Sequence, residues 1–222
     1  MSFFQEPPQL ANQYTTDRAL RLLLERRLPQ DVLGAVQGDL ENLGLRVAND
    51  IFDLCVAAQA QEPRLQQFDA WGNRIDEIHV SDAWKALGAI AAQEGLVALA
   101  YERPHGAASR IYQAAKLYLF NPSSAIYTCP LAMSDGAARL IEVHGDAALK
   151  ERAYKHLISR DPKDVWTSGQ WMTERAGGSD VSVTETTARS MAGGFELTGT
   201  KWFTSATTSQ MAMTLAKVEG DQ

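Results

Sequence analysis

Before Trp166, apolar residues recur every three or four positions, which is the spacing of one face of an α-helix. The clearest stretch predicts one long helix that Asp31 caps and that ends before Glu62-Pro63. Its apolar positions are Leu40, Leu43, Val47, Ile51 and Leu54. The same spacing predicts a short helix behind Thr16 or Asp17, and further helices from Ser81-Asp82, over 111–118, over 131–143 and from Asp146.

Other stretches carry a strand pattern. Residues 65–68 and 75–80 flank the segment 69–73, in which Gly72 and Asn73 tolerate the positive φ of a tight turn, so a small hairpin is expected. From Trp166 onward Thr, Ser, Val and Gly prevail. Residues 184–189 and 194–197 are separated by Ala192-Gly193, which predicts a second, antiparallel hairpin.

These patterns predict an α+β fold with two domains. Residues 1–165 form an N-terminal all-α domain with a small hairpin, and residues 166–222 form an antiparallel β domain. Three or four short strands cannot close a barrel or cover both faces of a sheet. The β domain is therefore expected to be incomplete, as in the N-terminal portion of a longer protein.

Composition and charge narrow the class of protein. The 222 residues are 45% hydrophobic with a net charge of -6, and no run of Lys or Arg is longer than Arg26-Arg27, so an electrostatic footprint for nucleic acid is missing. No apolar run approaches the roughly 18 residues of a membrane span. Cys55 and Cys129 lie far apart without a metal-type spacing. We expect free thiols, a cytoplasmic location and no membrane partner.

Several catalytic motifs are missing from the sequence. The four histidines are dispersed, without the spacing or the neighbouring cysteines of a metal centre, so no metal is expected. Ser168 and Ser179 lack the G-x-S-x-G setting of a hydrolase nucleophile, and a G-x-G-x-x-G dinucleotide fingerprint is not found.

The stretch Thr173–Asp180 is the most informative one for chemistry. It places a hydroxyl, an acid, two glycines and another hydroxyl within eight residues, so backbone N–H groups can approach a flat heteroaromatic ligand closely. Taken alone, Gly177-Gly178 indicates a surface turn, but the string with its neighbours favours a cofactor site. Trp202 follows Gly199 on a segment expected to be a strand, which would point Trp202 and Phe203 to opposite faces.

Two motifs carry a resemblance to a known family. Residues 170–180 resemble the Met-Thr-Glu-x-x-Gly-Gly-Ser-Asp loop of the acyl-CoA dehydrogenases, and residues 199–204 resemble the Lys-Trp-x-Thr strand beside it. Residues 64–76 and 80–84 resemble the AidB-like, alkylation-response branch, whose hairpin is absent from ordinary fatty-acid members. The resemblance spans nearly the whole chain, and it implies an acyl-CoA dehydrogenase type of fold.

The resemblance implies FAD as cofactor and an acyl-CoA thioester as substrate, oxidised between its α and β carbons in a homotetramer. It implies a contact of Ser179 with the cofactor or the acyl-CoA. It also implies that the general base lies beyond residue 222, so that no catalytic residue is named and the chain alone is inactive. The residues implied to bind the cofactor are Gln170, Trp171, Met172, Thr173, Gly178, Ser179, Trp202, Phe203 and Thr204.

Two alternatives remain beside the dehydrogenase hypothesis. One is a DNA-associated flavoprotein that protects against alkylation damage, with DNA bound through a C-terminal part that these residues lack. The other is a non-catalytic interaction module whose exposed strand edges require a partner chain.

Overall fold

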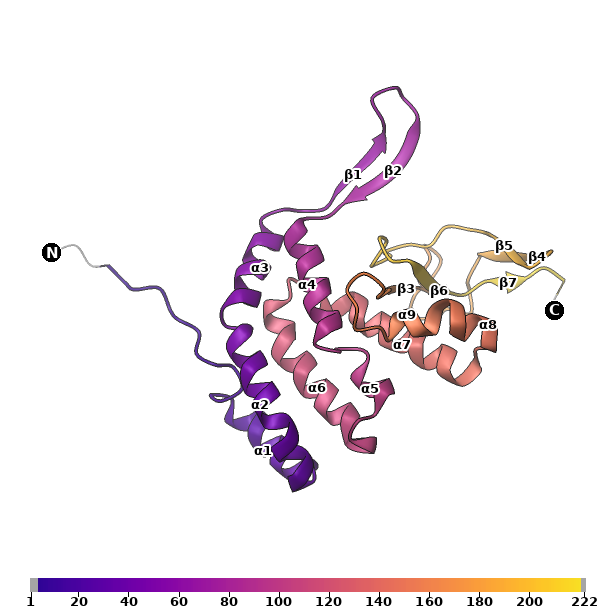
Figure 1. Ribbon diagram of the computed structural model, residues 1–222. Coiled ribbons are helices and arrows are strands. Elements are labelled where there is room, and N and C mark those ends of the chain that lie inside the picture. The colour runs from indigo at the N-terminus through magenta and orange to yellow at the C-terminus, as the bar shows by residue number, and fades with distance from the viewer. Residues whose placement is uncertain (1–3, 221–222) are drawn as a thin grey trace. The chain divides into compact units, whose positions relative to one another are not determined.

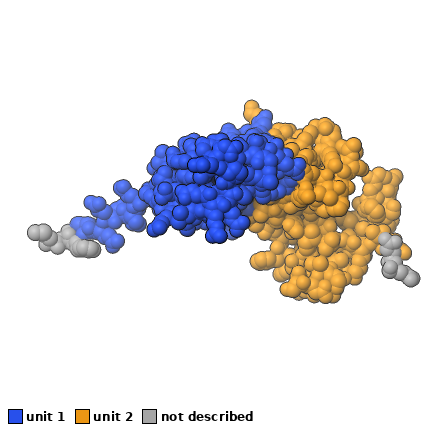
Figure 2. Space-filling view, turned by 90° about the horizontal axis from the view of Figure 1, so that it is seen from below, with its two compact units in different colours: residues 1–128, 160–162 blue, residues 129–159, 163–222 orange. Residues whose placement is uncertain are grey.

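A computed structural model describes residues 4–220 of the protein (Figure 1). They form two compact units, which Figure 2 colours blue and orange. Unit 1 lies within residues 1–128 and 160–162, and unit 2 within residues 129–159 and 163–222. Helix and strand are both present in the described residues, which confirms the predicted α+β class.

Unit 1 is a bundle of helices around an apolar core. Within it α3 packs beside α4 and α2 packs beside α6. The helices are α1 (Arg18–Arg27), α2 (Gln30–Arg46), α3 (Asp50–Gln59), α4 (Asp82–Gln93), α5 (Leu99–Glu102) and α6 (Ser109–Phe120), with the 3-10 turns η1 (Gly106–Ala108) and η2 (Asn121–Ser123). Fully buried side chains include Leu24, Leu40, Leu43, Ile51, Leu87, Leu96 and Phe120.

The caps of two helices agree with the prediction, because Asp17 accepts a hydrogen bond from the backbone N–H of Leu20 (2.8 Å) and Ser81 accepts one from that of Trp84 (3.1 Å). The Asp31 cap is wrong: Pro29 occupies the N-cap position of α2, and Asp31 lies in the first helical turn. In the first turn, the negative charge of Asp31 still interacts favourably with the positive N-terminal end of the helix dipole.

The long helix predicted from Asp31 is also wrong, because it is two helices. The backbone leaves the helical region at Asn49, with φ -131° and ψ -103°, between α2 and α3. Val47 and Ile51, on either side of the break, are both fully buried. The apolar spacing therefore continues through the bend, and the periodicity alone could not reveal it.

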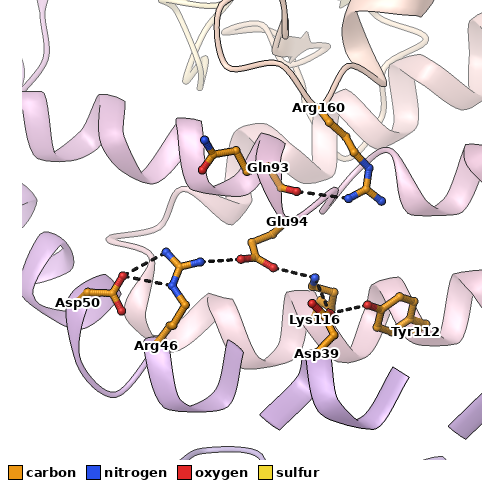
Figure 3. Close-up of polar contacts among 8 residues, drawn as sticks. All are labelled: Asp39, Arg46, Asp50, Gln93, Glu94, Tyr112, Lys116 and Arg160. Carbon is orange, nitrogen blue, oxygen red and sulfur yellow. Dashed lines mark hydrogen bonds and ion pairs between the residues drawn. The ribbon is translucent and has the colours of Figure 1, made fainter. Parts of the chain in front are cut away.

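A network of charged side chains, with the buried Lys116 among them, joins helices of unit 1 (Figure 3). Lys116 of α6 is only 3% exposed, and its ammonium lies 2.7 Å from a carboxylate oxygen of Asp39 and 2.7 Å from one of Glu94. Glu94 also pairs with Arg46 of α2 at 2.6 Å. Burial opposes ionisation of Asp39, but hydrogen bonds from Lys116 and Tyr112 outweigh it and lower the pKa of that carboxyl.

The hairpin predicted for the segment around Trp71 is confirmed. Strands β1 (Arg64–Phe68) and β2 (Arg74–His79) pair antiparallel, and Gly72 adopts a φ of 83° in the turn. Figure 1 shows the hairpin reaching away from the ends of α3 and α4, and Trp71 at its tip is 86% exposed.

Helices of unit 2 precede its strands. Helix α7 (Thr128–His144) corresponds to the helix predicted over 131–143. Asp146 caps the next helix, as predicted, by accepting a hydrogen bond from the N–H of Leu149 at 2.7 Å. That helix consists of α8 (Ala147–Leu149), the π-helical turn η3 (Lys150–Tyr154) and α9 (Lys155–Leu157). None of the helices in residues 4–220 is long and apolar enough to cross a membrane.

Two small sheets complete unit 2. Strands β4 (Thr187–Met191) and β5 (Gly194–Thr198) form the predicted antiparallel hairpin, with Gly193 at a φ of 85° in its turn. The prediction of an antiparallel β domain is wrong for the other two strand pairings in the described residues, which are parallel: β3 (Ser168–Trp171) with β6 (Met211–Thr214), and β4 with β7 (Lys217–Val218). Parallel partners come from distant parts of the chain, so local patterns do not predict them.

Candidate functional site

The loop Thr173–Asp180 begins where β3 ends, and the end of β3 is fixed on two sides. The indole N–H of Trp171 donates to the carbonyl of Ser205 (2.9 Å). The hydroxyl of Thr214 donates to the carbonyl of Trp171 (2.8 Å). The strand that leads into the loop is therefore held by both its side chain and its backbone.

Gly177 and Gly178 are required because other atoms of the loop lie too close to leave space for a side chain. A Cβ on Gly177 would lie 2.7 Å from the carbonyl oxygen of Asp180, and one on Gly178 would lie 2.8 Å from Cγ2 of Thr173. Neither glycine has a positive φ. The turn closes through hydrogen bonds from the N–H of Glu174 to the carbonyl of Gly177 (2.9 Å) and from the N–H of Gly177 back to Glu174 (3.2 Å).

Trp202 lies directly beside the start of this loop. Its backbone N–H donates to the carbonyl of Thr173 (2.9 Å). The predicted strand over 199–204 is wrong, because its only ladder contact in the described residues is a single bridge between Lys201 and Glu174. Phe203 adopts a φ of 55°, which ends the extended conformation.

Aromatic surface is exposed on this segment. The side chain of Trp202 is 54% exposed and that of Phe203 is 93% exposed. The guanidinium carbon of Arg175 lies 5.6 Å from the centre of the Trp202 ring, within the range of a cation–π interaction. A flat ring and a positive charge therefore meet at the loop.

The remaining predicted site residues differ in exposure. Met172, Thr173 and Thr204 are partly buried, as is Trp171, whereas Gln170, Gly178 and Ser179 are exposed. The structure brings Thr173 into contact range of Gly178 and joins it to Trp202 through the backbone.

A polar cluster behind the loop was not among the predicted site residues. The carboxylate of Glu174 is 3% exposed and lies 2.5 Å from the ammonium of Lys201. It also accepts hydrogen bonds from the hydroxyls of Thr184 (2.5 Å) and Thr186 (2.6 Å). The sequence signals that could have indicated this cluster are the hydroxyls of Thr184 and Thr186 at alternating positions and Lys201 just before Trp202.

The charge state of Glu174 follows from these partners. The hydrogen bond from Lys201, with those from Thr184 and Thr186, holds the pKa of the Glu174 carboxyl far below its usual range. The group is therefore ionised throughout the physiological range. Within residues 4–220, no three His, Cys, Asp or Glu residues are placed to hold a metal ion.

Two known families match consecutive parts of the chain. The N-terminal domain of the adaptive response protein AidB matches residues 5–163, and the middle domain of the acyl-CoA dehydrogenases matches residues 169–222. The chain belongs to the acyl-CoA dehydrogenase family, in its AidB-like branch. The resemblance inferred from the two motifs and the hairpin is thereby confirmed.

The relatives that this chain matches are longer than the chain itself. Acyl-CoA dehydrogenase family member 11 of Caenorhabditis elegans is 40% identical over 97% of the chain, which spans 36% of that relative. The solved apo form of Bd2924 is 53% identical, with a TM-score of 0.96, over 100% of this chain and 45% of its own.

A second solved structure is that of Caenorhabditis elegans ACDH-11 in complex with C11-CoA. It has a TM-score of 0.93 and 40% identity over 97% of this chain and 37% of its own length. These similarities confirm the acyl-CoA dehydrogenase type of fold, with a helical N-terminal part followed by part of a β domain. The boundary between residues 165 and 166 stays a prediction.

Proposed function

We propose that this chain contributes one wall of an FAD site to an enzyme that dehydrogenates acyl-CoA thioesters between their α and β carbons. The observation that carries the proposal is the hydrogen bond from the Trp202 N–H to the Thr173 carbonyl. It brings together a hydroxyl side chain and an indole from two separate motifs, both of which the family resemblance assigns to the flavin.

The chemistry of the residues present fits a flavin. Its ring system is flat and carries carbonyl and nitrogen acceptors, and the chain offers the exposed Trp202 ring with the hydroxyls of Thr173, Ser179 and Thr204. Arg175 adds a positive charge suited to a cofactor that contains a pyrophosphate. The missing side chain of Gly178 leaves room for the Thr173 side chain, whose hydroxyl is proposed to meet the flavin.

Each set of residues has a proposed task. Gln170, Trp171 and Met172 line the flavin through the loop that leaves β3, and Trp202, Phe203 and Thr204 complete the aromatic side. The flavin, when bound, supplies the acceptor for the hydride that leaves the substrate.

The substrate class is proposed from the relatives. The solved structure of ACDH-11 holds C11-CoA, which supports an acyl-CoA thioester as the substrate here, with Ser179 as a contact. Glu174 is unsuited to remove the α proton, because its carboxylate is buried and already accepts hydrogen bonds from Lys201, Thr184 and Thr186, which lower its pKa and make it a weak base. We therefore expect the general base in a part of the whole protein other than residues 1–222. A homo-oligomer, a cytoplasmic location and DNA contact stay predictions.

Titration of the purified chain with FAD, followed by flavin fluorescence, tests the proposal. The unaltered chain should quench the flavin saturably, and Trp202→Ala should weaken both binding and quenching, because it removes the exposed ring. Trp71→Ala, an exposed Trp at the tip of the β1–β2 hairpin, is the matched control and should leave the titration unchanged. The proposal fails if the unaltered chain gives no saturable change, or if Trp202→Ala binds FAD equally well.

A further inference from the structure

Glu174 is the most densely hydrogen-bonded side chain near the proposed flavin wall. Its Oε1 accepts from the Lys201 ammonium, from the hydroxyls of Thr184 and Thr186, and from the Thr186 N–H at 3.2 Å. Its Oε2 accepts from the backbone N–H of Glu185 at 2.5 Å. The carboxylate therefore connects its own loop to two other segments, 184–186 and the one that carries Lys201.

Burying this charge is costly unless it is paired. Lys201 is 11% exposed and supplies the opposite charge, while the threonine hydroxyls satisfy the remaining acceptor capacity. Lys201 also donates to the hydroxyl of Thr184 at 3.1 Å. Both charged groups of this ion pair have hydrogen-bond partners. Moving either side chain would leave a buried charge without partners, so the pair favours one geometry.

The position of the pair in the chain decides what it orders. Glu174 directly follows Thr173, and Lys201 directly precedes Trp202. Thr173 and Trp202 are themselves joined by a backbone hydrogen bond of 2.9 Å. The ion pair and this hydrogen bond thus form two adjacent links between the same two segments.

We propose that Glu174 is a positioning residue for the cofactor: through Lys201 it fixes the Thr173 hydroxyl and the Trp202 ring at one separation before the flavin arrives. This inference rests on the proposed flavin site. A site whose polar and aromatic parts are already in place loses less conformational freedom on binding, and therefore binds more tightly.

Glu174→Gln is the direct test, because it keeps the shape and removes the charge. The new amide nitrogen is a donor that faces the Lys201 ammonium or the Glu185 N–H, so one buried donor is left opposite another. The loop should then move relative to Trp202. Glu196→Gln is the matched control, since it removes a carboxylate from the exposed pair with Arg189 in the same unit.

Two quantities separate positioning from general weakening in an FAD titration followed by flavin fluorescence. Glu174→Gln should raise the Kd for FAD roughly tenfold or more, the scale of losing a hydrogen bond to a charged group. It should also lower the quenching that remains at saturating FAD, because the ring no longer meets the flavin correctly. Lys201→Met should act in the same direction, and Lys201→Arg should restore part of both values.

A measurement without FAD keeps the inference testable if a variant folds poorly. Thr184→Val removes one hydroxyl from the cluster and leaves the charges, and it should accelerate amide hydrogen exchange at Thr173–Gly178 and at Trp202. Normal FAD binding and full quenching in Glu174→Gln would overturn the inference and leave the proposed function standing. A wild-type chain that never binds FAD would overturn the proposed function, and the inference with it.

Discussion

Replacement of Lys116 by methionine isolates the contribution of the buried charge network to stability. The side chain is 3% exposed, so methionine fits the same space without its charge. The change leaves Asp39 and Glu94 without the ammonium that lies 2.7 Å from each of them.

The expected loss follows from what the two carboxylates retain. Removing one partner of a fully buried ion pair costs about 3–5 kcal/mol. Asp39, however, is 40% exposed and keeps the hydroxyl of Tyr112, and Glu94 keeps Arg46. We therefore expect a loss of about 2–3 kcal/mol in the free energy of unfolding, somewhat below the fully buried case.

Urea unfolding followed by far-ultraviolet circular dichroism measures this loss. The matched control is Lys85→Met; the Lys85 side chain is 63% exposed and pairs with an exposed Asp82 one helical turn away. Such a surface pair contributes about 0–1 kcal/mol. If Lys116→Met costs no more than Lys85→Met, the network does not stabilise unit 1 in the way described.

Acid adds a second readout with a definite sign. The folded-state pKa of Asp39 is lowered, so the stability it contributes is fully present above the ordinary value of 3.8 and is lost as the pH falls below that value through the lower folded-state pKa. Lys116→Met removes a main cause of the lowering. The stability difference between the two proteins should therefore shrink from neutral pH toward about pH 3, and a constant difference would contradict the assignment.

Three glycine substitutions extend these predictions. Gly44→Ala should cost about 1–3 kcal/mol, because its Cβ would lie 2.6 Å from the backbone nitrogen of Tyr14; limited proteolysis of the N-terminal arm should also accelerate. Gly34 lies in the same helix, and a Cβ added there would meet no atom within 4 Å. Gly34→Ala should therefore raise the free energy of unfolding in urea by about 0.5–1 kcal/mol. Gly178→Val should weaken FAD binding with little change in the unfolding midpoint, since its Cβ displaces Thr173 in an exposed loop.

Local patterns predicted the elements that depend on neighbouring residues. At Asp17, Ser81 and Asp146, the capping side chain accepts a hydrogen bond from the backbone N–H of the residue three positions later. The hairpin around Gly72 follows from turn chemistry. In each case the residues that decide the structure are adjacent in the sequence.

Where distant contacts decide the structure, the same patterns were insufficient. The bend at Asn49 keeps Val47 and Ile51 in one core, so the apolar period passes through it unchanged. The segment around Trp202 has strand-like residues but pairs with a loop, and Phe203 turns the backbone away.

The site was predictable only as far as the motifs reached. The loop and the Trp202 segment were identified by resemblance, and the structure joins them at Thr173. The cluster around Glu174 needed the fold, because Thr184 and Lys201 approach it from other parts of the chain.

Amide hydrogen exchange of the chain with and without FAD tests the central claim most directly, because it locates the cofactor on the residues named. The account predicts slower exchange on FAD addition at Thr173–Gly178 and at Trp202–Thr204, with no change in the β1–β2 hairpin. Unchanged exchange in both of those segments, or protection confined to other parts of the chain, would contradict it.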